Sequence, residues 1–257
     1  MGRICERAIQ VGLPAVIFTE HLDFEDSWWV NDGDVGEHAQ KYVDGTGHVR
    51  LPDFDADGYL EAIDRCRRTF PELLIRSGVE FGQPHLWDGR AAALLSSGAI
   101  DRISGSLHML PFDQYDRTEP TTLYRHKPAD DVMWAYLEEI PRMVAGSDTF
   151  EVFNHIDYAV RSWPIEVAGP FDPRRFEDGF RQAMQAIADS DRALEMNTKR
   201  LWSWIPQWWS EVGGRAVSFG SDAHGPDSLA ANFPEAVAMV DYFGFKPGSS
   251  PDAFWTR

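Results

Sequence analysis

Six short apolar runs alternate with longer amphipathic segments along most of this 257-residue chain, and this alternation constrains the fold more than any other feature. It is typical of repeated β/α units that build a parallel sheet. We expect six strands, all parallel, at residues 15–19, 73–80, 102–107, 150–154, 193–197 and 216–220. We expect helices at residues 3–11, 55–70, 88–97, 130–144, 171–190, 206–212 and 226–242. The sequence therefore predicts an α/β fold whose first element is a helix.

Composition indicates one enzyme-sized domain over residues 1–257, because 43% hydrophobic content at this length is enough for one large core. The net charge of −17 argues against nucleic acid and anionic membrane surfaces as partners, since both bind through Lys and Arg. A small substrate is favoured over a polymer. Cys5 and Cys66 are expected to be reduced core residues. With no apolar run of about 18 residues and no secretory signal pattern, we expect a cytoplasmic protein.

The predicted strands share a second property, since each ends at or near a residue that can bind a metal. The carboxyl ends of parallel strands meet at one face, so side chains distant in sequence converge there. The candidate ligands are His21, Glu80, His108, His155, Asp222 and His224. Imidazole nitrogen and carboxylate oxygen bind divalent metal ions such as Zn, Mn or Fe. Any one of the four His residues, taken alone, is equally well explained as a capped or solvent-facing side chain. The six candidates together, each at or near a strand end, predict a metal site.

Two predicted loops are longer than the others. Residues 25–53 are polar and glycine-rich, and residues 110–130 contain three prolines. Loops of this length in a compact domain are more often lids or substrate walls than connectors. Because both directly follow a strand, we expect both to lie over the site face.

The strand-end motifs resemble those of the PHP (polymerase and histidinol phosphatase) family of metal-dependent phosphoesterases, and most closely its histidinol-phosphatase branch. The matching segments lie between residues 18 and 224. They are Thr19-Glu20-His21 followed by Asp23, Gly78-Val79-Glu80, Gly105-Ser106-Leu107-His108, Asn154-His155-Ile156-Asp157, Glu195-Met196-Asn197-Thr198 and Gly220-Ser221-Asp222-Ala223-His224. The resemblance implies a distorted (β/α)7 TIM-like barrel with up to three divalent metal ions at its C-terminal face.

The resemblance also implies a division of the ligands among these ions. One ion would use Glu80 and Asp222, a second Glu80, His108 and His155, and a third His21 and His224. Asp222 and His224 are also implied to be catalytic. The activity implied is hydrolysis of a small phosphate ester, histidinol phosphate above all, by a metal-activated hydroxide.

Three further residues carry alternatives. Arg161 is similar in position to a phosphate-binding residue of histidinol phosphatases, and its planar fork matches phosphate. It is equally well read as a surface Arg paired to Asp157 or Glu166. Glu195 and Asn197 look like pocket residues or residues behind the metal ligands, and Glu195 either orients a metal-bound His or caps the next helix.

One family motif is absent from this sequence. The family begins with a strand that ends in His-x-His, and nothing of the kind precedes His21; His38 and His48 do not form it. The resemblance therefore implies that the first strand is missing and that the first and third ions lack ligands. We expect either a longer natural protein in which Met1 is internal, or a divergent, metal-poor and catalytically impaired binding protein. A metal-dependent amidohydrolase would need a Lys at a strand end, and none is found.

Overall fold

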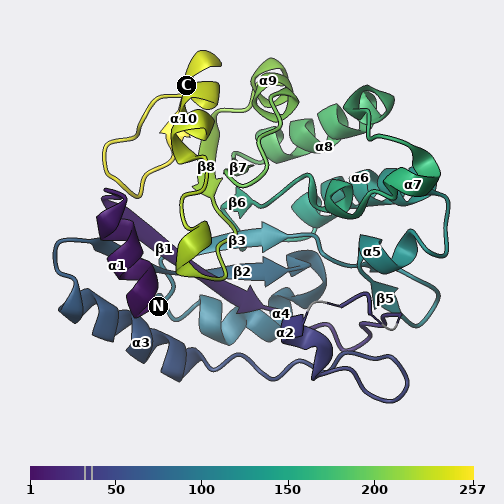
Figure 1. The fold of residues 1–257 in the computed structure, drawn as a ribbon, viewed down its shortest axis with the longest axis horizontal. Helices are drawn as coiled ribbons and strands as arrows, with labels where there is room; N and C mark the ends of the chain where they lie inside the picture. The colour runs from purple at the N-terminus through teal and green to yellow at the C-terminus, as the bar shows by residue number, and fades with distance from the viewer. Residues whose placement is uncertain (32, 36) are drawn as a thin grey trace.

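The computed structural model describes residues 1–31, 33–35 and 37–257, and it contains a curled, mostly parallel sheet with helices packed on its outside (Figure 1). The strand order is β1-β2-β3-β6-β7-β8-β9. The six predicted strands are all present and parallel: β1 (Ala15–Leu22), β2 (Leu74–Gly82), β3 (Arg102–Ser106), β6 (Val152–Phe153), β7 (Ala193–Asn197) and β8 (Ala216–Gly220). The sequence did not reveal β9 (Trp255–Thr256), which pairs antiparallel with β8, or the small pair β4 (Leu110–Pro111) and β5 (Arg117–Thr118).

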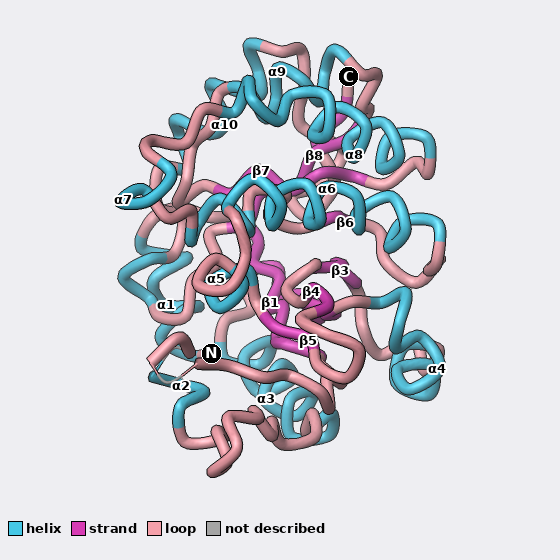
Figure 2. The backbone as a smooth tube through the Cα atoms, turned by 90° about the vertical axis from the view of Figure 1, so that its right-hand side faces the viewer, coloured by secondary structure: helices cyan, strands magenta, loops and turns pink. Residues whose placement is uncertain are grey.

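The longer helices occupy most of the predicted segments. They are α1 (Gly2–Gln10), α3 (Ala56–Thr69), α4 (Pro84–Leu95), α6 (Ala129–Ala145), α8 (Glu177–Asp189), α9 (Trp204–Glu211) and α10 (Phe233–Tyr242). Short turns of helix are α2 (Glu37–Gln40), η1 (Tyr158–Ser162), α5 (Pro120–Leu123), α7 (Ile165–Ala168), η2 (Pro173–Phe176) and η3 (Pro226–Ser228). Figure 2 shows α6, α8 and α9 at the β7–β8 end of the sheet and α3 and α4 at the opposite end.

The prediction of one continuous last helix over residues 226–242 was wrong. The chain forms the short η3 there and then α10. Between them, Ala230 and Asn232 adopt positive φ values of 56° and 51°, a conformation that a right-handed helix cannot contain. The prediction for residues 88–97 began too late, because Pro84 lies in the first turn of α4, where its missing N–H costs no hydrogen bond.

The hydrophobic core consists of several clusters. The largest lies among α6, α8, α9 and the strands β6 to β8, and it includes the buried Trp204, Trp208 and Trp209. A second lies among α1, α3 and the first two strands. Cys5 and Cys66 are buried there and are not joined by a disulfide, as the sequence predicted. Within the described residues, no helix is both long and apolar enough to cross a bilayer.

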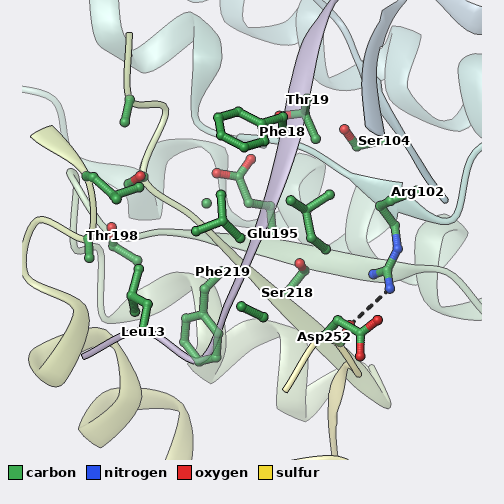
Figure 3. A pocket seen from close by; sticks show the side chains of 18 of the residues that line it. Leu13, Phe18, Thr19, Arg102, Ser104, Glu195, Thr198, Ser218, Phe219 and Asp252 are labelled. Atoms are coloured by element: carbon green, nitrogen blue, oxygen red, sulfur yellow. Dashed lines mark hydrogen bonds between the residues drawn. The ribbon is translucent and has the colours of Figure 1, made fainter. Parts of the chain in front are cut away.

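The two ends of the curled sheet face each other across a cavity of about 920 Å³. In the described part of the chain, β1 pairs only with β2, while β8 pairs with β7 and, at its start, with β9. Figure 3 shows Phe18 and Thr19 of β1 and Ser218 and Phe219 of β8 around this cavity. The architecture is thus a half-barrel. The candidate ligands lie at or just beyond the carboxyl ends of its strands.

The register of the first strands places the site. His21 of β1 lies opposite Glu80 of β2, and Glu80 lies opposite Ser104 of β3. Side chains at the ends of neighbouring strands are therefore brought together by backbone hydrogen bonds before any metal is considered.

The two long loops pack against each other near the carboxyl ends of β1 and β3. The Trp29 N–H donates to the Arg117 carbonyl at 2.9 Å, and the Arg117 N–H donates to the Ser27 carbonyl at 3.0 Å. His48 Nε2 lies 3.1 Å from Asp116 Oδ1. Residues 32 and 36 of the predicted loop 25–53 lie outside the described part. The two loops form one joined structure rather than two independent connectors.

The Tyr59 hydroxyl joins α3 to β1 and β2, and its removal gives a test of the sheet. It lies 2.8 Å from the carbonyl oxygens of Phe18 and Gly78 and accepts the Gly78 N–H at 2.8 Å. We expect Tyr59→Phe to lower the free energy of unfolding by about 1–2 kcal/mol, because buried backbone groups lose a partner. Urea unfolding measures the loss. Tyr115→Phe, at a site 77% exposed, is the matched control and should change nothing; equal stability of both variants would contradict this role for Tyr59.

Candidate metal centre

The centre of the candidate site is the buried carboxylate of Glu80, near the end of β2. Its Oε1 lies 2.6 Å from His155 Nε2 and 3.1 Å from His108 Nε2, and it accepts a hydrogen bond from the Ser106 hydroxyl at 2.7 Å. The two imidazole Nε2 atoms are 3.4 Å apart. Glu80, His108 and His155, which come from three different strand ends, therefore point their ligand atoms at one small region.

These three side chains fit a divalent metal. Donor atoms around a tetrahedral zinc ion lie roughly 3.3 Å apart, close to the separations seen here. The two Nε2 atoms face each other beside a carboxylate oxygen. Two N–H groups placed this way would repel each other, whereas two nitrogen lone pairs and the oxygen can share one cation. His21 extends the group, since one ligand atom from each of His21, Glu80 and His108 lies within 4.8 Å of the others.

The other three predicted ligands lie on the same face but are packed less closely. His21 Nε2 is 4.0 Å from Glu80 Oε2, and the side chain is half exposed. The His224 ring lies 6.1 Å from the His21 ring, and its Nδ1 is 3.7 Å from Asp222 Oδ1. Asp222 Oδ2 forms an ion pair with Arg161 at 2.8 Å. The structure thus brings all six residues to one face and three of them into direct contact.

The backbone is unusual at two of these residues. His155 and Asp222 have φ values of 26° and 49°, in a region that L residues rarely adopt. Such strain is often found at functional sites, where the surrounding structure holds it. The sequence carried no signal for it.

Arg161 is held beside the candidate ligands by one hydrogen bond. Its Nη1 donates to Asp222, whereas Nε and Nη2 are buried with no hydrogen-bond partner in the described part of the chain. Its ion-pair partner is thus Asp222 rather than the Asp157 or Glu166 considered from the sequence. Two unpaired guanidinium donors in a buried position are suited to an oxyanion.

The charges in the site balance one another. Burial alone would raise the pKa of Glu80, but His155 and His108 hold it well below its usual range. Burial would lower the pKa of His108, yet Asp23 and Glu80 raise it to about 10. Asp23 and Glu80 outweigh burial in the same way at His21 and raise its pKa to about 9. Burial lowers the pKa of His155. At neutral pH, protonated His21 and His108 therefore compensate the buried carboxylates.

Sequence reasoning assigned no role to Tyr158, which packs against two candidate ligands. Its ring centroid lies 4.7 Å from that of His108 and 5.2 Å from that of His155, and its hydroxyl donates to Glu119 at 3.1 Å. The available signal was its position three residues after His155. For Glu195 the structure favours the orienting alternative, because its Oε2 accepts the His155 backbone N–H at 2.8 Å.

Comparison with known proteins identifies the family of the chain. The model of the PHP domain family matches residues 1–199. This chain belongs to the PHP domain family. The PHP chain is 27% identical over 254 residues to the "Probable histidinol-phosphatase" of Clostridium acetobutylicum, covering 94% of this chain and 88% of that protein. It is 25% identical over 249 residues to the histidinol-phosphatase of Lactococcus lactis subsp. lactis, covering 93% and 83%.

A solved structure shares the fold of this PHP chain. It is that of histidinol phosphate phosphatase from Lactococcus lactis subsp. lactis, complexed with Zn, L-histidinol and phosphate. The TM-score is 0.73 at 20% sequence identity, with 95% of this chain and 87% of the other covered. The likeness confirms the curled α/β architecture.

Protons on His21 and His108 should compete with a metal ion for the same imidazole nitrogens. With pKa values of about 9 and 10, His21 and His108 are protonated at pH 7, and a metal ion requires the neutral imidazole. We expect Zn²⁺ binding to release about two protons at pH 7, and the affinity to rise with pH until these residues are neutral. Calorimetric titration of the metal-free protein in buffers of different ionisation enthalpy measures the release. Binding that releases no protons would contradict the charge balance described above.

Proposed function

We propose that this protein is a metal-dependent phosphomonoesterase and that its substrate is L-histidinol phosphate. The observation that carries the proposal is the convergence of Glu80, His108 and His155. The Tyr158 ring packs against both histidines and against Arg161, which has two buried donors without a hydrogen-bond partner in the described part of the chain. Membership of the PHP family and the names of the relatives support the same activity. The negative net charge is consistent with a small substrate rather than a nucleic acid.

The proposed ligands divide into an inner and an outer group. Glu80, His108 and His155 would hold one divalent ion, and His21, Asp222 and His224 would contribute to up to two more. We propose Zn, with Mn or Fe as alternatives that accept the same donors; the Zn complex of the Lactococcus enzyme supports this choice. When bound, such ions supply Lewis-acid chemistry, drawing charge from phosphate oxygens and activating water as the nucleophile.

The remaining work is done by the side chains around the ligands. Arg161 would bind a phosphate oxygen through its planar fork, and its pair with Asp222 fixes the guanidinium beside the candidate ligands. The Tyr158 ring, 5.1 Å from the Arg161 guanidinium, supports it from one side. Asp222 pairs with Arg161, and His224 Nδ1 lies 3.7 Å from Asp222 Oδ1. We propose both as catalytic residues because this position would bring them close to a phosphate bound by Arg161.

We also propose that the half-barrel is a form of the distorted (β/α)7 TIM-like barrel, within one domain. The parallel order of β1 to β8 and the likeness to the Lactococcus structure support this description. The candidate ligands at the carboxyl strand ends are where such barrels carry their active sites.

Phosphate release from a panel of phosphomonoesters that includes L-histidinol phosphate tests the activity. We expect hydrolysis that requires added divalent metal and falls at least about 100-fold in His108→Ala and Asp222→Asn, because each removes a proposed ligand. Asp26→Asn, at a side chain 75% exposed, is the control. Unchanged activity in both site variants would rule the proposal out.

Metal analysis of the purified protein separates the enzyme from the alternative of a metal-poor binding protein. Two to three equivalents of metal per chain favour the enzyme, and none favours the binding protein. The measurement is independent of which substrate is used.

Arg161 is tested separately from the ligands. We expect Arg161→Met to weaken inhibition by inorganic phosphate about 10- to 100-fold, because charged hydrogen bonds are worth about 1.5–3 kcal/mol. Arg161→Lys should recover only part of this, since an ammonium group lacks the planar fork. Inhibition constants from steady-state kinetics give the comparison, and equal inhibition of Arg161→Met and the native protein would exclude Arg161 from phosphate binding.

A further inference from the structure

Asp23 is a largely buried carboxylate that lies between two of the proposed ligands. It follows β1 by one residue, and its side chain is 14% exposed. Its Oδ2 lies 3.2 Å from His21 Nδ1, and its Oδ1 lies 3.9 Å from His108 Nδ1. Oδ1 is fully buried and has no hydrogen-bond partner in the part of the chain described here. A single carboxylate therefore faces two imidazole rings that come from different strands.

Both rings present the same two nitrogen atoms to the same two carboxylates. Each turns its Nδ1 toward Asp23 and its Nε2 toward Glu80, with Nε2 to carboxylate distances of 4.0 Å for His21 and 3.1 Å for His108. The two ring centroids are 5.7 Å apart. An imidazole that keeps its proton on Nδ1 leaves the lone pair of Nε2 for a metal, and a carboxylate at Nδ1 fixes this tautomer.

The space for Asp23 depends on Gly82, the last residue of β2. A Cβ at residue 82 would lie 1.9 Å from Asp23 Oδ1, closer than any real contact allows. Gly82 does not have a positive φ, so this requirement comes from packing and not from backbone conformation. Next to it, the Gln83 side-chain oxygen accepts the backbone N–H of His108 at 2.8 Å, which fixes the position from which the His108 ring extends.

We propose that Asp23 is a positioning residue that holds His21 and His108 together in their metal-binding orientation, and that Gly82 provides the space it needs. This inference rests on the proposed metal site, but not on the identity of the substrate. It joins an outer ligand, His21, to an inner one, His108, so that a change at Asp23 acts on both.

Two substitutions test the inference through metal affinity. Asp23→Asn retains the shape but presents an amide N–H to one of the rings, which favours the wrong tautomer, and Gly82→Ala displaces Asp23 without changing it. We expect both to weaken Zn²⁺ binding about 10- to 100-fold, measured by competition with a chromophoric chelator. Asp26→Asn is the matched control, because Asp26 is exposed and pairs with Arg90. Native Zn²⁺ affinity in folded Asp23→Asn would overturn the proposal.

A spectroscopic measurement on the native protein does not depend on any variant being folded. Nitrogen-15 shifts of the Zn²⁺-loaded protein should show the proton on Nδ1 of both His21 and His108, and a proton on Nε2 of either would overturn the proposal. A native protein that binds no Zn²⁺ would overturn this inference together with the metal site. Zn²⁺ binding with the expected tautomers but no phosphate release would overturn the proposed function alone.

Discussion

The buried negative charge of Glu80 is the constraint on which the rest of the site depends. A carboxylate removed from water costs several kcal/mol unless charges and hydrogen bonds compensate it. Here the compensation comes from His108, His155 and the Ser106 hydroxyl, which all reach the same oxygen. The parallel register of β1, β2 and β3 supplies these partners, because it places the carboxyl ends of the strands side by side.

Two acidic side chains lie on opposite sides of the His21 and His108 rings. Glu80 lies on the Nε2 side of His21 and His108, and Asp23 lies on their Nδ1 side. The first is placed to share a cation with the rings, and the second is placed to orient them. Protons on these histidines neutralise both carboxylates in the metal-free chain. Under the proposed function, metal binding at these histidines would exchange their protons for the ion.

Much of this was predictable from local sequence. The alternation of apolar runs with amphipathic segments identified six parallel strands, and the candidate ligands were chosen because each lies at or near the end of such a run. The predictions failed where the backbone conformation departs from what the pattern of apolar residues indicates, or where a strand is too short to produce such a pattern. The last helix is interrupted at Ala230 and Asn232, and β9 is a two-residue strand whose pairing with β8 is not encoded in any local pattern. Arg161 was predicted to lie at the site, but its pairing with Asp222 was not, because 61 residues separate them.

The sequence by itself determined the class of the fold and the kinds of atoms at the site. Short apolar runs that alternate with longer amphipathic segments are typical of a β/α architecture, and His and carboxylate residues near strand ends indicate a divalent metal ion. Only the tertiary structure decided which candidate ligands converge, since Glu80, His108 and His155 are in contact while His224 lies at the edge of the group. The tertiary structure also decided which side chains contact the candidate ligands on the side away from Glu80. Asp23 belonged to a family motif in the sequence, but nothing there showed its packing against Gly82, which exists because β1 and β2 end at the same level.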